Sequence, residues 1–282
     1  MTDARRRHMP KSTSKMNEIS SLSRKSAWAD WWDGTRRIDV WWTLACFDIT
    51  LRYRRSMLGP LWITLSMAAM IGGMGPLYSS LFNTPLTTFF PHIALGLIFW
   101  SAFSSMINDS CNTLIHASNY LKQGYFPISL FVWRSLSRNI IQFLHHVILY
   151  LPVAWWAGIS LKFSSLLVIP AFLLLLINAH ALGLALGIIC ARFRDVTQIV
   201  TSILQMLMFL TPVFWMPESL PGRAHYVMWN PLAEMLELLR KPLMGEIALL
   251  KYWIGITIWT ITIISVSAVL FVKFRRRVVY WL

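Results

Sequence analysis

The chain has 282 residues, of which 56% are hydrophobic and 13% are charged, whereas ordinary soluble domains have a charged content of roughly 25%. This composition excludes a soluble globular enzyme, and it also excludes intrinsic disorder, which requires low hydrophobicity. The cysteines Cys46, Cys111 and Cys190 lie too far apart to indicate a disulfide scaffold. The class that remains is an all-α polytopic membrane protein.

The first 25 residues are predicted to form a basic, disordered tail. Arg5, Arg6 and Arg7 are followed by a polar run rich in Ser, Lys and Asn. A secretory signal would instead have an apolar stretch after its basic residues, so we do not expect this segment to be one.

Residues 26–56 are dense in tryptophan but too polar to span a membrane. Apolar side chains follow the i, i+3, i+4, i+7, i+8, i+11 spacing of one helical stripe at Ile38, Trp41, Trp42, Ala45, Cys46 and Ile49. Arg37, Asp39 and Asp48 fall on the other faces. This pattern predicts an amphipathic interface helix that lies in the headgroup plane. The alternative is a tryptophan-rich helix packed on the protein's own helices.

Segments without Asp, Glu, Lys or Arg are long enough for six membrane spans, since one span needs about 20 apolar residues. The charge-free block between Arg55 and Asp109 is too long for one helix. It is interrupted at 83–85 and at 91–92, so it predicts two helices. The predicted spans are residues 57–82, 93–116, 128–157, 163–190, 196–216 and 251–272.

Lys and Arg concentrate on one side of these spans. With both termini in the cytoplasm, the cytoplasmic segments contain the basic tail, Lys122, Arg192, Arg194 and the closing run 273–277, as the positive-inside rule requires. We therefore assign the net charge of +14 to topology and to contact with anionic membrane lipids. No nucleic acid partner is expected.

The outer segment 218–250 is too long for a simple turn. Asn230 and Pro231 have the pattern of a helix cap followed by the first helical position. One apolar face follows at Leu232, Met235, Leu236 and Leu239. This segment predicts a short amphipathic helix at the outer rim, which could re-enter the membrane before the last span.

No motif for ATP hydrolysis or metal binding stands out. The chain lacks the G-x-x-x-x-G-K-[ST] phosphate loop, so we do not expect it to bind ATP by itself. His145 and His146 are adjacent, so on a helix they point about 100° apart and do not predict a metal site.

Glu234 and Glu237 form the only close carboxylate pair of the outer segments, and a paired acid and base could serve a transferase or glycosidase. Arg240 and Lys241 follow Glu237 at i+3 and i+4, which is typical of a solvated helix face. We therefore favour the solvated face over catalysis.

Three ionisable residues fall near the cytoplasmic ends of predicted spans: Asp109 in the second, and Arg134 and Arg138 early in the third. Charges at membrane depth are costly and usually face protein or water. They predict either an Asp–Arg contact that fixes helix packing, or a polar inner mouth that receives an anionic group of a substrate.

Three segments together resemble the permease subunit of ABC-2 type exporters, particularly the branch that exports O-antigen of lipopolysaccharide and other surface polysaccharides. RYRRSMLGPLW at 52–62 leads into the first span, ARFRDV at 191–196 joins the fourth and fifth, and WNPL at 229–232 lies outside. The resemblance extends over most of the chain after the basic tail and identifies 57–282 as an ABC-2 type transmembrane domain.

This resemblance implies a transport subunit of the bacterial inner membrane and no enzymatic activity on this chain. In that family a homodimer joins two ATPase subunits, which bind ATP and Mg²⁺, so the chain itself needs no cofactor. The implied substrate is a lipid-linked polysaccharide that moves from cytoplasm to periplasm. The implied ATPase-coupling segment lies between the second and third spans, at Asn119, Tyr120, Leu121, Lys122 and Gln123.

A glycan path needs aromatic faces on which sugar rings stack. Candidates are Trp62 on the first span and Phe209, Phe214 and Trp215 on the fifth, although aromatics also gather in lipid-facing belts. A basic inner mouth would combine Arg52, Arg54, Arg55, Asp109, Arg134 and Arg138. Two alternatives are an ABC-2 exporter of a drug or small lipid, and an integral membrane transferase that acts on lipid-linked sugars.

Overall fold

The computed structural model describes residues 26–123, 126–160, 162–217 and 230–282, and every regular element within these ranges is a helix. The predicted tail 1–25 and residues 218–229 of the outer segment lie outside them. The helices are α2 (Ala27–Arg36), α3 (Ile38–Arg52), α4 (Leu61–Leu81), α5 (Leu86–His116), α6 (Ser118–Lys122), α7 (Ile128–Val147), α8 (Tyr150–Trp156), η1 (Phe163–Leu167), α9 (Val168–Arg192), α10 (Val196–Leu210), α11 (Pro231–Leu243) and α12 (Leu250–Trp281).

Four of the six predicted spans correspond to helical segments that are long and apolar enough to cross a membrane. These segments are Leu61–Leu81, Leu86–Lys122, Phe163–Arg192 and Leu250–Trp281. Helix α10 is apolar but has only 15 residues, about 22 Å at a rise of 1.5 Å per residue. Helix α7 carries Arg134 and Arg138, which lower its hydropathy.

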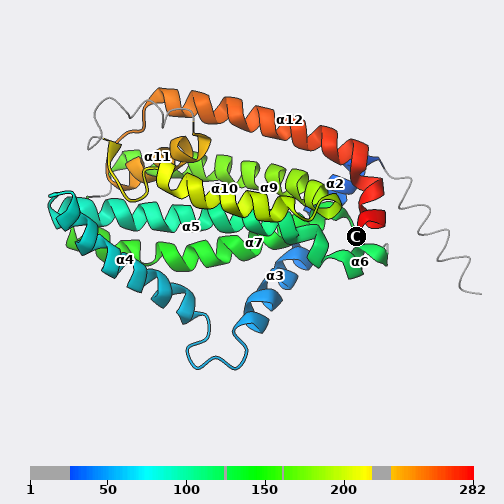
Figure 1. The fold of residues 1–282 in the computed structure, drawn as a ribbon, viewed down its shortest axis with the longest axis horizontal. Coiled ribbons are helices and arrows are strands. Elements are labelled where there is room, and N and C mark those ends of the chain that lie inside the picture. Colours follow the sequence, from blue (N-terminus) through cyan, green and yellow to red (C-terminus); the bar gives the residue numbers. More distant parts are fainter. Residues whose placement is uncertain (1–25, 124–125, 161, 218–229) are drawn as a thin grey trace, which may run out of the picture.

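Helix α5 forms the centre of the bundle, because α4, α7, α9 and α10 all pack against it. Figure 1 shows α12 along one flank, where it packs on α9, while α3 and α4 diverge from the bundle on the opposite side. Phe99 and Phe103 of α5 are fully buried. At Gly96 the backbone after α10 comes so close that a Cβ would lie 2.8 Å from the Val213 carbonyl oxygen. The central helix is thus enclosed by protein over most of its length.

Two predicted helix boundaries differ from the structure because of prolines. The predicted third span 128–157 is divided at Ile148 and Leu149 into α7 and α8. Pro152 has no N–H, and its ring would clash with the carbonyl of Ile148 in a continuous helix. The predicted fifth span 196–216 already ends at Leu210, because Thr211 precedes Pro212 and is extended at φ −88°, ψ 141°.

Two other helices are longer than predicted. Helix α5 begins at Leu86 and includes Pro91 in its second turn, whereas the sequence predicted a start at 93. Helix α12 continues past 272 to Trp281, so the basic residues that close the last span are helical. Both extensions are polar or proline-containing, which is why an apolar window did not include them.

Residues 26–56 form two helices, α2 and α3, which meet at Arg37, and both pack on α7. Trp31 Nε1 donates to His180 Nε2 at 3.0 Å, and Trp133 Nε1 donates to Thr35 Oγ1 at 3.0 Å. Trp41 stacks on Trp133 with ring centroids 5.8 Å apart. Other large apolar side chains of this segment are exposed: Trp28, Trp32, Ile38, Trp42 and Phe47. The tryptophans therefore divide between packing on the bundle and an exposed apolar face.

Gly34 allows α2 to approach α7. A Cβ at this position would meet Ser129 Oγ and would lie 2.7 Å from the Leu130 backbone nitrogen. We expect Gly34→Ala to lower the free energy of unfolding by about 1–3 kcal/mol, the usual cost of overpacking. Thermal unfolding in detergent measures this loss. The control is Gly72→Ala, where no atom lies within 4 Å and alanine favours the helix; equal melting temperatures for the two variants would contradict the close contact.

Candidate functional site

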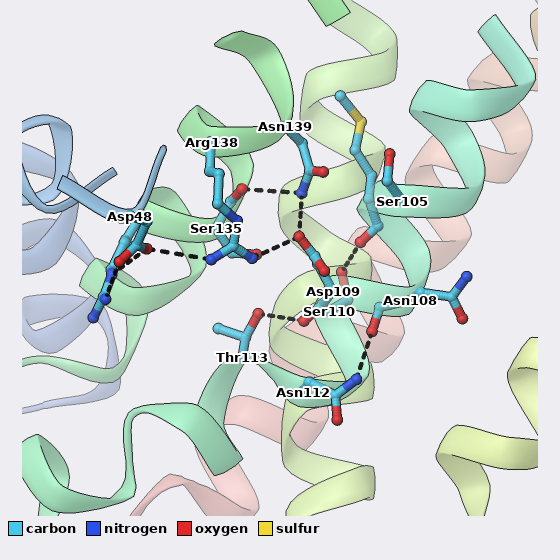
Figure 2. A network of polar contacts seen from close by, with 12 residues as sticks. Asp48, Ser105, Asn108, Asp109, Ser110, Asn112, Thr113, Ser135, Arg138 and Asn139 are labelled. Atoms are coloured by element: carbon cyan, nitrogen blue, oxygen red, sulfur yellow. Dashed lines mark hydrogen bonds and ion pairs between the residues drawn. The ribbon is translucent and has the colours of Figure 1, made fainter. Parts of the chain in front are cut away.

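Charged residues from three helices meet in one cluster at the end of the bundle that carries α6. Asp109 comes from α5, Arg134 and Arg138 from α7, and Asp48 from α3. Arg138 Nη2 donates to Asp109 Oδ2 at 2.6 Å, and its Nη1 donates to Asp48 Oδ2 at 3.2 Å. Arg134 forms a bidentate pair with Asp48 at 2.9 and 2.6 Å. Figure 2 shows the Asp48–Arg138–Asp109 chain that joins α3, α7 and α5.

Uncharged polar side chains extend this cluster (Figure 2). Asn139 Nδ2 donates to Asp109 Oδ2 at 3.0 Å and to the Ser135 carbonyl at 3.0 Å. At the residue before Asp109 on α5, Asn108 Oδ1 accepts from Thr201 Oγ1 of α10 at 2.9 Å. Hydrogen bonds from this region of α5 thus reach α7 and α10, and the arginines continue the link to α3.

The cluster has a formal charge of zero, since two arginines face two aspartates. The predicted Asp–Arg contact is present between Asp109 and Arg138. Both arginines donate hydrogen bonds to carboxylates. The four charged side chains are 16–30% exposed, and partly buried ion pairs are tolerated when their charged groups are paired, as they are here. Of the two predicted roles, the geometry therefore favours an ion-pair cluster that fixes the positions of helices. It does not favour a basic mouth that receives an anion.

Sequence reasoning missed two members of the cluster, Asp48 and Asn139. Asp48 was assigned to a water-facing side of the interface helix. A signal was available: two arginines in one predicted span need two acidic partners, and only Asp109 lay within the spans. The second carboxylate therefore had to come from outside them.

The other predicted residues of the inner mouth lie elsewhere. Arg52, Arg54 and Arg55 are exposed at the end of α3 and in the connection to α4, and they do not join the cluster. Figure 1 shows this connection projecting away from the bundle. Arg55 adopts a left-handed backbone conformation with φ 69°, which reverses the chain between the two helices.

Three of the four predicted aromatic path residues come together at the C-terminal end of α10 and in the residues that follow it. Phe209 and Phe214 have ring centroids 6.2 Å apart, and Trp215 Nε1 donates to the Phe209 carbonyl at 3.0 Å. Phe214 is buried and stacks on Tyr78 of α4, whereas Phe209 is 69% exposed. Trp62 is exposed at the opposite end of α4, sixteen positions before Tyr78 and so about 24 Å away along the axis.

The other end of the bundle contains an ion pair that is fully buried. Glu237 and Arg240 of α11 are 4% and 2% exposed and contact one another through Oε1 and Nη2. Arg240 Nη1 also donates to His92 Nε2 at 2.9 Å and to the Pro212 carbonyl at 2.7 Å. The prediction of a solvated helix face was therefore wrong for this pair, because α11 inserts between other helices.

This burial also bears on the transferase alternative. Glu237 is engaged with Arg240, while Glu234 lies against α12, where a Cβ on Gly255 would be 2.6 Å from its Oε1. Burial raises the pKa of Glu234, and the charge of Lys251 opposes this shift. The two carboxylates point to different partners, so they do not form the acid and base of one catalytic site.

The predicted coupling segment forms the short helix α6. Asn119, Lys122 and Gln123 are exposed, and Tyr120 is partly exposed with its ring against Phe131. Leu121 is instead buried in the chain's own core, so it is not available to a partner. Of the two side chains expected to enter a groove of a partner, only Tyr120 presents an open face.

Comparison with known proteins places the chain among transporter components. The sequence profile of the ABC-2 type transporter family matches residues 39–244. The polysialic acid transport protein KpsM of Escherichia coli is 26% identical over 209 residues, which cover 70% of this chain and 78% of KpsM. The O-antigen export system permease protein RfbA of Klebsiella pneumoniae is 23% identical over 197 residues, which cover 67% of this chain and 74% of RfbA.

Proposed function

Because this chain belongs to the ABC-2 type transporter family, we propose that it is the permease subunit of an exporter that moves a lipid-linked polysaccharide of O-antigen type out of the cytoplasm. The observation that carries this proposal is the similarity, over more than two thirds of each protein, to a polysialic acid transport protein and to a permease protein of an O-antigen export system. The four long apolar helices support the same function. A separate ATPase subunit would bind ATP and Mg²⁺.

We propose six spans with both termini in the cytoplasm of a bacterial inner membrane. The two further spans would be α7 with α8, and α10 with the chain that follows it. The arginines of α7 are paired with aspartates, which reduces the cost of their burial at membrane depth. Helix α10 is shorter than the roughly 30 Å hydrocarbon core. Residues 211–217 and the inserted helix α11 would occupy the remaining depth on that side.

The glycan path would lie between two copies of the chain. Exposed aromatic side chains on α4 and α10 support this arrangement, since Trp62 is 48% exposed and Phe209 is 69% exposed. Facing copies would enclose these side chains along one path. Phe214, buried behind Phe209 and stacked on Tyr78, would hold the lining in position without contacting sugar.

Helix α6 would transmit the ATPase movement, together with the charge cluster. Tyr120 lies over Arg134, with the guanidinium carbon 5.8 Å from the ring centroid. Arg134 in turn pairs with Asp48 of α3. A push on α6 would therefore reach α7 and the interface helices through one continuous set of contacts.

We expect Tyr120→Ala to weaken binding of the ATPase subunit by about tenfold or more, because exposed aromatic anchors dominate such interfaces. Tyr120→Phe keeps the ring and should bind almost normally. Lys122→Ala, on the same helix, tests whether the positive charge of Lys122 contributes to binding of the ATPase subunit. Co-purification and titration of the ATPase in detergent measure these effects. Equal affinity of Tyr120→Ala and the parent chain would remove α6 from the interface.

Reconstitution tests the proposed function. The chain and its ATPase, placed together in vesicles, should translocate a lipid-linked glycan when ATP is added, and the chain alone should neither transport it nor hydrolyse ATP. ATP hydrolysis by the isolated chain would contradict the assignment. A gene deletion that leaves surface polysaccharide intact would favour the alternative of an ABC-2 exporter of a drug or small lipid.

A further inference from the structure

An apolar groove of about 510 Å³ lies between α2, α7, α9 and α12, and none of its lining residues belongs to the charge cluster or the aromatic path. This volume is within the range of roughly 300–1,000 Å³ that is usual for small-molecule sites. Its lining contains no charged residue, and its only polar side chains other than tryptophan are His180 and Ser267. Such a lining fits a hydrocarbon chain.

The α12 side of the groove is one helical stripe. It is formed by Ile264, Ser267, Ala268, Phe271 and Val272, at i, i+3, i+4, i+7 and i+8. The same stripe continues at i+11 and i+12 with Arg275 and Arg276. The apolar groove therefore ends, within one helical turn, at basic residues.

These two arginines have different environments. Arg275 is buried, and its Nη1 lies 3.6 Å from Asp30 Oδ2, which joins α12 to α2 at the end of the groove. Arg276 is exposed beside it. Lys273 and Arg277 add positive charge at the same level of α12, but they point away from the stripe. An anionic group that follows a hydrocarbon chain out of the groove would meet Arg276.

Tryptophans of α2 and α7 also line the groove. Trp28 is largely exposed, while Trp31 and Trp133 lie deeper, next to His180. Trp31 donates its indole proton to His180 Nε2, so its polar atom is satisfied and its ring is presented to the groove. Tryptophan is enriched at the level of lipid headgroups. The groove thus combines an apolar length, indole rings and a basic end in the order found along a phospholipid molecule.

We propose that this groove is a binding site for one acyl chain of an anionic glycerophospholipid of the membrane, whose phosphate contacts Arg276. The charge at the open end selects this occupant over a neutral hydrocarbon. The lining of the groove also distinguishes it from general lipid contact, because Ile261 and Val269 on the exposed side of α12 do not line it. The site does not depend on which substrate the protein exports.

Photo-crosslinking of the full chain in vesicles tests the proposal. The vesicles are made of phosphatidylcholine with a minor fraction of phosphatidylglycerol or phosphatidylethanolamine that carries a diazirine in one acyl chain. We expect crosslinked peptides from α9 and α12. The phosphatidylglycerol probe should label them several-fold more strongly than the phosphatidylethanolamine probe. Arg276→Gln should lower the phosphatidylglycerol signal about fivefold, since one basic residue contributes about this factor towards anionic lipid. Arg277→Gln, which removes the same charge from a position about 100° further around α12 and away from the groove, should leave it unchanged.

A second pair of variants tests the groove itself. Ala268→Phe fills the groove and should abolish the labelling of α9, whereas Val269→Phe adds the same ring to the exposed neighbouring position and should not. If Ala268→Phe lowers the melting temperature, Ala268→Leu replaces it. Equal labelling in the two phenylalanine variants, or equal signals from Arg276→Gln and Arg277→Gln, would overturn the proposal. So would crosslinks confined to other helices, or crosslinks to a protein that covers the groove.

Discussion

Replacing Arg138 with methionine is expected to lower the free energy of unfolding by about 3 kcal/mol, the low end of the loss when one partner of a buried ion pair is removed, because this cluster is only partly buried. Among the residues that the structure describes, Arg138 alone pairs with both Asp48 and Asp109, and it is 16% exposed. Its loss leaves Asp109 with Asn139 as a neutral partner at membrane depth. Titration with SDS in detergent micelles measures the change.

Two further variants show whether the loss comes from the unpaired charge. Arg194→Met removes an exposed arginine and should leave unfolding almost unchanged. The double variant Arg138→Met with Asp109→Leu should recover most of the stability, because apolar replacement of a whole buried pair is often neutral. Asp48 keeps its bidentate partner Arg134 in this variant. No recovery in the double variant would mean that Arg138 acts through packing alone.

Replacing Arg240 with methionine is expected to lower the free energy of unfolding by about 3–5 kcal/mol, because its pair with Glu237 is fully buried. Arg240 holds together three elements: Glu237 on its own helix α11, His92 on α5, and the Pro212 carbonyl after α10. Methionine keeps the apolar stem but leaves Glu237 buried and charged without its cation. Helix α11 should then separate from the bundle, which limited proteolysis would detect as new cleavage near residues 230–243.

Lys241 is the matched control, since it is the next residue and also basic. Its ion pair with Glu246 spans 3.5 Å, and Glu246 is mostly exposed. Exposed pairs contribute about 0–1 kcal/mol, so Lys241→Met should change unfolding little. Similar losses for the two variants would indicate that charge near α11, and not the buried contacts of Arg240, stabilises this end.

Local patterns in the sequence were sufficient for much of the fold. Composition and the spacing of charges predicted a helical membrane protein and positioned every predicted span on a helical segment of the structure. Asn230 and Pro231 predicted the start of α11, where Asn230 Oδ1 accepts from the Leu232 backbone nitrogen at 3.0 Å. These features depend on residues a few positions apart, so a single chain displays them. The helix ends at Ile148 and Leu210 were equally local, and Pro152 and Pro212 could have predicted them.

Only the tertiary structure decided which side chains meet. Asp48 and Arg138 are ninety positions apart, and nothing in a helical stripe indicates whether its polar side faces water or another helix. The same ambiguity made Glu237 and Leu121 look accessible although both are buried. The physical reason is that periodicity reports only the direction in which a side chain leaves its helix. Burial depends on whether another helix packs against that side, and this is set by contacts between helices distant in sequence.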